Sequence, residues 1–271
     1  MKLAVKSLPL RPLILGLLIA LGACGGNESK DQIPATNGPI TVFAASSLTD
    51  AFKQIGLEFE RTHVGSTVTL NFASSSVLST QIKEGAPADV FAAADPDTMG
   101  ALVTGGQAEA PRVFATNALV IVVPRDGTTV KAFSDLAKPG VKLVLAGKDV
   151  PAGKYARQVL AKASVDPDLG ADFASRVLAN VKSEESSVRA VLAKVQLGDA
   201  DAGVVYRTDL QAAKGEVVGI TFPSDFNIVA TYPIAVIKDR KQNATARGFV
   251  DFVNSKSGQE ILARYGFGGA P

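Results

Sequence analysis

The chain has 271 residues, of which 46% are hydrophobic and 20% are charged, and its formal net charge is +2. This composition excludes wholesale disorder, and the length is enough for two modest α/β domains or one large one. Cys24 is the only cysteine, so an intrachain disulfide is excluded.

The first 23 residues have the pattern of a signal peptide. Lys2, Lys6 and Arg11 precede the apolar run Leu13–Leu21, which is too short to span a membrane as a mature helix. The run ends in Leu-Gly-Ala-Cys at Cys24, which resembles a bacterial lipobox and implies cleavage before Cys24 and lipidation of that residue. The alternative is an ordinary secretory signal followed by a chance cysteine.

Removal of residues 1–23 takes away three basic residues and no acidic ones, so the formal charge changes from +2 to −1 (+2 minus 3). A chain so close to neutral gives no indication of a nucleic-acid partner. Residues 24–38 are polar and contain Gly and Pro, which predicts a flexible tether between the lipid anchor and the folded part.

The stretch Ile40–Asp50 predicts a strand that leads through a turn of small residues into a helix. Strand formers occupy its start, Ala and Ser follow, and apolar residues then recur at helical spacing as far as Phe59. Ser47 stands where an N-cap is expected, with Asp50 three residues later, as in a capping box. The free N–H groups and the dipole of the first helical turn would form an anion site there.

The same arrangement is predicted twice more in the next fifty residues. A strand over Ser66–Phe72 leads through Ala73–Ser76 into a second helix. A third strand over Ala88–Ala94 leads into a helix that Asp95 caps, with Pro96 in its first turn. We expect several of these helix N-termini to face one bound anion.

The rest of the chain continues the alternation of strands and helices, which is typical of an α/β fold with largely parallel sheets. The further elements expected are strands over 118–123, 142–145, 202–206, 217–222 and 229–237, and helices over 133–136, from Pro151, over 169–178, 184–197, 244–253 and 258–265. The long apolar strands 118–123 and 229–237 are candidate crossover segments. They predict one lobe of residues 39–120 plus 228–271 and a second lobe of residues 121–227.

Six segments in this order resemble the periplasmic molybdate-binding proteins of ABC importers. They are Thr41–Asp50, Phe72–Ser76, Gly85–Asp89, Val150–Ala156, Gly203–Tyr206 and Arg264–Phe267. The resemblance implies a two-lobed type II solute-binding fold, with mixed, mostly parallel sheets flanked by helices and a ligand cleft between the lobes. It also implies a monomer in the periplasm or at the cell surface, an ABC permease as partner, molybdate or tungstate as ligand, and no cofactor.

The resemblance also implies which residues contact the oxyanion: the hydroxyls of Ser47 and Ser75, the backbone at Ala152 and Val188, and the hydroxyl of Tyr206. The match at Val188 is the least complete. The family commonly reads Ala-Glu-Asp-Val-Arg there, whereas this chain reads Glu-Ser-Ser-Val-Arg over residues 185–189 and so adds the hydroxyls of Ser186 and Ser187.

This set of residues agrees with the chemistry of the ligand. Molybdate, tungstate and sulfate are dianions near pH 7 and only accept hydrogen bonds, so their site needs only donors. Hydrogen phosphate carries a proton and would need an acceptor. None of the five positions is acidic or basic, and no cationic metal site is indicated, so helix dipoles and local donors would have to offset the desolvation of the anion.

Other interpretations of the same residues stay open. Ser47 could only cap a helix, Ser74–Ser76 could be a polar turn, Pro151 could only start a helix, and Tyr206 could be a core residue. The protein could bind another oxyanion such as sulfate, or be a secreted hydrolase with a Ser-Lys pair. An enzyme is not expected, because His63 is the only histidine and neither a Gly-x-Ser-x-Gly elbow nor a phosphate loop is present.

Overall fold

The computed structural model describes residues 37–127, 129–241 and 243–270. The signal peptide, Cys24 and the tether up to residue 36 lie outside the described residues. Within the described ranges, no helix is both long enough and apolar enough to cross a membrane.

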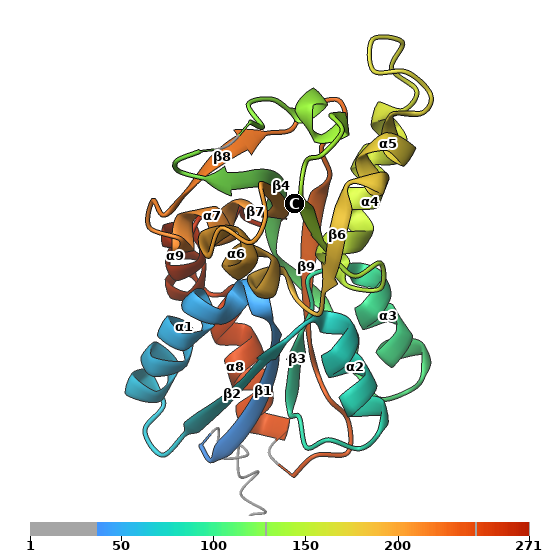
Figure 1. Ribbon diagram of the computed structural model, residues 1–271. Coiled ribbons are helices and arrows are strands. Elements are labelled where there is room, and N and C mark those ends of the chain that lie inside the picture. The colour runs from blue at the N-terminus through green and yellow to red at the C-terminus, as the bar shows by residue number, and fades with distance from the viewer. Residues whose placement is uncertain (1–36, 128, 242, 271) are drawn as a thin grey trace, which may run out of the picture. The chain divides into compact units, whose positions relative to one another are not determined.

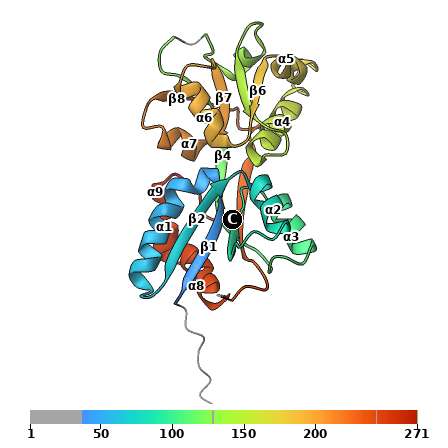
Figure 2. The same ribbon diagram turned by 60° about the horizontal axis from the view of Figure 1, so that its bottom comes forward.

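The strands form one continuous sheet that we divide into a first and a second half-sheet (Figures 1 and 2). The first half-sheet has the order β2-β1-β3-β9-β4, and the second consists of β4, β7, β5 and β6, with β8 on β4. The strands are β1 (Pro39–Ala45), β2 (Thr67–Ala73), β3 (Val90–Ala92), β4 (Arg112–Pro124), β5 (Leu143–Ala146), β6 (Val181–Glu185), β7 (Ala202–Tyr206), β8 (Val217–Thr221) and β9 (Val229–Val236).

Strand β4 belongs to both half-sheets. Its first part, Arg112–Ala118, pairs with β9, and its second part, Leu119–Pro124, pairs with β7 and β8. Eight residues of this strand are buried, including the β-branched run Val120–Val123, which suits a position in the interior of a sheet. The lobe bounds given above, 39–120 plus 228–271 and 121–227, stay a prediction.

The sheet is mixed, as expected, but its parallel pairs do not outnumber the antiparallel ones. Among the described strands, β1 with β2, β1 with β3, β5 with β6 and β5 with β7 are parallel. The four pairs that contain β4 or β9 are antiparallel. The expectation of mostly parallel sheets was wrong because the alternation of strands and helices does not indicate the direction of β4 and β9, whose pairs are all antiparallel.

Helices cover both faces of each half-sheet. They are α1 (Thr49–Thr62), α2 (Ser75–Lys83), α3 (Pro96–Thr104), α4 (Pro151–Ala163), α5 (Phe173–Ala179), α6 (Val188–Gln196), α7 (Arg207–Ala212), α8 (Asn243–Asn254) and α9 (Lys256–Arg264), with short 3-10 helices at Ser46–Leu48 and Phe133–Ala137. In the first half-sheet, α1, α8 and α9 pack together on one face and α2 and α3 on the other (Figure 2).

Alternate residues of the central strands supply the two cores. In β1, Val42 points into the larger core with Phe52 and Phe249, while Phe43 points into the smaller core with Leu78 and Phe91. This is the two-residue period of a strand that is buried on both faces. In the larger core the rings of Phe52 and Phe249 lie 6.1 Å apart in an edge-to-face arrangement.

Two expected helices, over 169–178 and 184–197, begin four residues later than predicted, and the sequence analysis missed a strand and a helix. Residues Glu184 and Glu185 were expected to begin a helix, but they end β6, and α6 begins only at Val188. The edge strand β6 alternates between half-buried and exposed residues, which places its polar side chains outward and conceals the strand in a search for apolar runs. The six-residue helix α7 was also missed.

Gly153 determines how closely α4 approaches the end of β5. A Cβ atom at this position would collide with the backbone carbonyl oxygens of Ala146 and Gly147. Pro151 and Ala152 form the first turn of α4, so any shift of the helix would displace that turn.

We therefore predict that Gly153→Ala destabilises the protein by about 1–3 kcal/mol, the usual cost of overpacking. Gly100→Ala is the matched control, because Gly100 also lies in a helix but a Cβ atom there would meet nothing within 4 Å beyond its own helix. The control should be neutral or stabilising by up to about 1 kcal/mol. Denaturant unfolding measures both, and equal stabilities of the two variants would contradict this account of Gly153.

Candidate functional site

All five residues expected to contact an anion lie around one small pocket. The pocket lies where the two half-sheets meet, and the space in it that admits the centre of a water molecule is about 10 Å³. The lining residues are Ala45, Ser46, Ser47, Ser74, Ser75, Ala94, Val150, Pro151, Ala152, Val188 and Tyr206. None of these side chains carries a charge. The structure thus brings together the five positions, and their role as contacts of an anion stays a prediction.

Each lining segment is the junction of a strand and a following helix. Ser47 follows β1, Ser75 begins α2 just after β2, and Ala152 and Val188 lie in the first turns of α4 and α6. The first N–H groups of a helix have no partner within the helix and carry the positive end of its dipole. Four such junctions around one pocket therefore provide backbone donors and a positive potential without a cation.

Ser47 does not cap the first helix, so this part of the sequence analysis was wrong. It lies in the 3-10 helix Ser46–Leu48, α1 begins at Thr49, and no side chain caps α1. Instead, the Ser47 hydroxyl lies 3.0 Å from the hydroxyl of Tyr232 in β9. The extra 3-10 turn moves Ser47 off the helix start and leaves its hydroxyl available at the pocket.

Ser75 has a defined hydrogen-bond role. Its neighbour Ser74 is the N-cap of α2 and accepts from the backbone N–H of Val77. The Oγ atom of Ser75 accepts a bond from the backbone N–H of Ala94, 2.9 Å away, which joins α2 to the end of β3. A hydroxyl whose oxygen already accepts one bond has its proton left to donate.

Tyr206 presents a buried hydroxyl to the pocket. The residue is 1% exposed, and its hydroxyl makes no hydrogen bond of ordinary geometry within the described part of the chain. Burial raises the pKa of Tyr206 well above its usual value, so the hydroxyl stays protonated at neutral pH. A buried polar group without a partner costs about 1–3 kcal/mol, which a ligand that accepts its proton would recover.

The additional hydroxyls of the Glu-Ser-Ser-Val-Arg segment do not line the pocket. Ser187 caps α6 by accepting from the backbone N–H of Ala190 at 3.3 Å, and Ser186 is exposed. Both residues therefore leave the backbone of Val188 free to face the pocket.

Ion pairs join the helices of the two half-sheets on either side of the pocket. Arg189 in α6 bonds to Asp50 in α1 at 2.7 Å and also to Asp209 at 2.7 Å, while Lys154 in α4 pairs with Asp97 in α3. Arg189, the cation next to the pocket-lining Val188, is thus already paired with two carboxylates.

A larger groove lies beside these ion pairs. Its lining includes Lys53, Lys214 and Arg264, and it shares Asp50 and Arg189 with the ion-pair network. The groove contains none of the five expected positions, and its basic residues Lys53, Lys214 and Arg264 are exposed. It is the alternative place for an anion.

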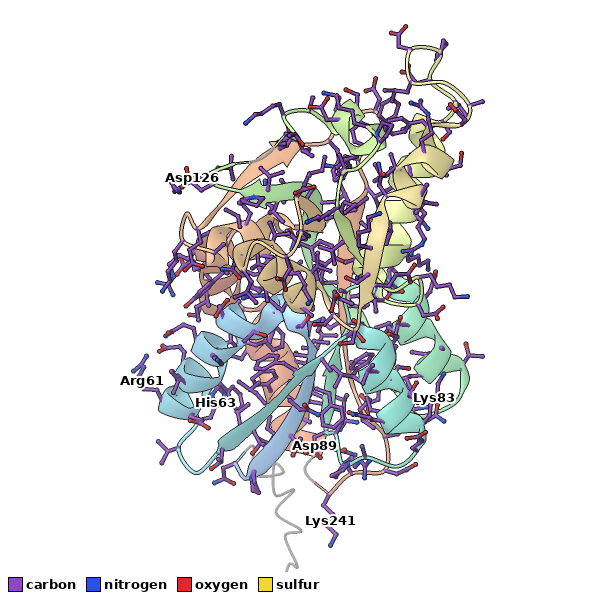
Figure 3. All side chains as sticks on the ribbon, viewed as in Figure 1. Arg61, His63, Lys83, Asp89, Asp126 and Lys241 are labelled. Carbon is purple, nitrogen blue, oxygen red and sulfur yellow. The ribbon has the colours of Figure 1, made fainter. Side chains whose placement is uncertain are left out.

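The only histidine of the sequence lies away from the pocket (Figure 3). His63 follows the last turn of α1 and stacks on Phe59 with ring centroids 4.0 Å apart. Figure 3 shows it at the end of α1 opposite the one next to the pocket, a distance of about 20 Å for a helix of this length. Among the described residues, no group of three or more His, Cys, Asp or Glu could hold a metal ion.

The comparison with protein families gives an assignment for this chain. Residues 40–268 match the family described as bacterial extracellular solute-binding protein. The chain belongs to this family. The family comprises solute-binding proteins rather than enzymes, and its members lie in the periplasm or at the cell surface.

Individual relatives and structures agree with the assignment. The chain is 40% identical over 262 residues to the molybdate-binding protein ModA of Mycobacterium tuberculosis, with coverage of 94% of this chain and 95% of the relative. It is similar in structure to the periplasmic molybdate-binding protein of Azotobacter vinelandii, with a TM-score of 0.72, 20% identity and coverage of 84% and 98%. The sulfate-binding protein SubI of M. tuberculosis gives a TM-score of 0.77 at 19% identity, with coverage of 85% and 86%.

These neighbours confirm the two-lobed α/β fold that the sequence predicted. At 19–20% identity they carry no information on the ligand of this chain. The residues that sequence reasoning missed are Tyr232 and Asn117, which lie behind Ser47. Their only signal in the sequence is a polar atom within otherwise apolar strands, and such residues are common in cores.

We predict that Ser47→Ala and Ser75→Ala each weaken oxyanion binding by about 1.5–3 kcal/mol, the range for hydrogen bonds to charged groups. Calorimetric titration gives the affinities directly. Ser76→Ala is the matched control, because Ser76 lies in the same turn outside the pocket lining. Unchanged affinity in both Ser47→Ala and Ser75→Ala would show that the anion binds elsewhere.

A second prediction concerns pH. Burial raises the pKa of Asp209 to about 6, against the opposing effect of Arg189, and Asp209 accepts from the backbone N–H of Tyr206 at 3.1 Å. A bound dianion favours the protonated form of a nearby carboxyl, so binding and proton uptake reinforce each other.

We expect the affinity for a dianion to be flat between pH 7 and 8.5 and to rise modestly as pH falls through 6. Titrations at constant ionic strength, with sulfate as a second ligand that stays fully deprotonated, measure this profile. A decrease in affinity on acidification, or a step between pH 7 and 8.5, would reveal a different titrating group.

Proposed function

We propose that this protein captures molybdate or tungstate outside the cytoplasm and delivers it to an ABC permease. The observation that carries the proposal is the donor character of the pocket. Among the described residues the buried Tyr206 hydroxyl has no partner of ordinary hydrogen-bond geometry, and the Ser75 oxygen is already occupied by a backbone donor. An acceptor-only ligand complements both groups. The 40% identical relative named as a molybdate-binding protein supports this choice of ligand.

The five ligand-contacting positions are part of the same proposal. Ser47, Ser75 and Tyr206 would donate through their hydroxyls, and Ala152 and Val188 through their backbone N–H groups. Hydrogen phosphate is rejected in this arrangement because its proton would meet donors only, and the groups left unpaired make such discrimination steep.

The location of the protein follows from the N-terminal pattern. We propose that lipidation of Cys24 anchors the chain to a membrane surface and that the following residues, up to 38, form a tether. A relative 31% identical to this chain is named as a substrate-binding lipoprotein of Bacillus subtilis, which supports this arrangement. A single acyl chain binds a membrane only marginally, so firm anchoring needs more than one chain at Cys24.

Sulfate is the second candidate ligand, because it has the same charge and acceptor character and because a sulfate-binding protein shares the fold. A Ser-Lys hydrolase receives no support, since none of the residues that line the pocket is a lysine. Molybdate and sulfate have the same charge, so the preference between them depends on the size of the occupied cavity. The similarity to molybdate-binding relatives favours a cavity that fits the larger ion, molybdate.

A thermal-shift panel tests the proposal. Binding to the folded state alone stabilises it by RT ln(1 + [L]/Kd), about 2.7 kcal/mol at a hundredfold excess of ligand over Kd. We expect a rise in melting temperature with molybdate and tungstate, a small rise with sulfate at the same concentration, and none with phosphate. Equal shifts with phosphate and molybdate, or a shift with sulfate alone, would contradict the proposal.

A further inference from the structure

A buried chain of polar side chains lies directly behind Ser47. The Ser47 hydroxyl is 3.0 Å from the Tyr232 hydroxyl, and the side-chain amide nitrogen of Asn117 lies 3.4 Å from the same Tyr232 oxygen. The same amide bonds to Thr208 in α7 at 2.9 Å. All four residues are buried. Only Ser47 belongs to the pocket lining, so the other three would act on a ligand through it.

The direction of these bonds follows from the Asn117 amide. Its oxygen accepts from the backbone N–H of Ala118 at 3.0 Å, which fixes the NH₂ group toward Tyr232 and Thr208. An amide NH₂ can only donate. The Tyr232 oxygen is therefore an acceptor on its Asn117 side, and its own proton is left for another group. The hydroxyls of Ser47 and Tyr206 are both near, but only that of Ser47, at 3.0 Å, has hydrogen-bond geometry among the described residues.

We propose that Tyr232 is a positioning residue that donates its proton to the Ser47 oxygen, so that Ser47 presents its own proton to the pocket. In the opposite arrangement Ser47 would donate to Tyr232 and turn a lone pair toward the anion, which would be repulsive. The inference rests on the proposed oxyanion function. It adds Tyr232 as the group that determines whether the Ser47 hydroxyl turns its proton or a lone pair toward the anion.

Under this proposal Ser47 and Ser75 act in the same way: the oxygen of each accepts a hydrogen bond from the protein, and the proton of each is left for the ligand. Ser75 has its oxygen occupied by the backbone N–H of Ala94, and Ser47 has its oxygen occupied by Tyr232. Burial raises the pKa of Tyr232 above its usual value, so its proton is retained. Its ring is fixed by edge-to-face contacts with Tyr206, at 5.9 Å, and Phe267, at 5.4 Å.

A double-mutant cycle with Tyr232→Phe and Ser47→Ala tests this coupling, because phenylalanine keeps the ring and removes only the hydroxyl. Molybdate titration of the wild-type protein comes first, and absence of binding there would refute the proposed function itself. We expect Tyr232→Phe to weaken molybdate binding roughly three- to thirtyfold in the wild-type background, as for residues coupled in one network.

In the Ser47→Ala background the same change should alter the affinity less than about twofold, since the group on which Tyr232 acts is gone. In the Ser75→Ala background it should keep its full effect. Tyr265→Phe, at the end of α9, is the matched control. Tyr265 lines the larger groove and not the pocket, so the change should leave the affinity unaltered, and an effect would indicate that the anion binds in the groove and would contradict the proposal. The melting temperatures of the unliganded variants identify losses of affinity that come only from a less stable fold.

An equal effect of Tyr232→Phe in the wild-type and Ser47→Ala backgrounds would overturn the inference and leave the oxyanion function intact. No effect in the wild-type background would also overturn it. If Tyr232→Phe does not fold, Asn117→Ala removes the donor that orients Tyr232 and is judged by the same cycle with Ser47→Ala.

Discussion

In the proposed function, the pocket has to hold a doubly charged anion away from water without a cation among its lining residues. An anion that only accepts hydrogen bonds must be surrounded by donors, and a hydroxyl is a reliable donor only when its oxygen is already satisfied by another group. The protein meets this condition at Ser75 through a backbone N–H, and the proposed role of Tyr232 would meet it at Ser47.

The fold provides these donors because several strand-to-helix junctions end at the same place. Strands β1 and β2 run parallel and lead into α1 and α2, while β5 and β6 run parallel and lead into α4 and α6. The carboxyl ends of parallel neighbours share one edge of a sheet, so the helix N-termini gather there. The strand β4, common to both half-sheets, brings the two sets of junctions together.

The charged residues next to the pocket have another role. Arg189 is the nearest candidate to neutralise an anion, yet it is paired with Asp50 across the half-sheets and with the buried Asp209. These pairs, together with Lys154 and Asp97, connect the helices that carry the pocket residues. Arg189 is partly exposed, so solvent screening limits what its pair with Asp50 contributes to stability.

The sequence predicted much of this arrangement for identifiable reasons. Asp95 with Pro96 and Pro151 at the start of α4 are strong local signals, and both helices begin where predicted. The cap at Ser47 was wrong because a 3-10 turn precedes α1, and the Ser47 hydroxyl bonds to Tyr232 in β9 instead of to the helix. Tyr232 lies 185 residues from Ser47 in the sequence, so no local pattern could have paired them.

A crystal structure of the purified protein with bound tungstate would test the central claim most directly, because the strong anomalous signal of tungsten locates the anion independently of the protein. We predict one peak in the pocket, with the tungstate oxygens at hydrogen-bond distance from the hydroxyls of Ser47, Ser75 and Tyr206 and the backbone N–H groups of Ala152 and Val188. No lysine or arginine side chain should contact the anion. A peak in the groove lined by Lys53, Lys214 and Arg264, with the pocket empty, would contradict the account.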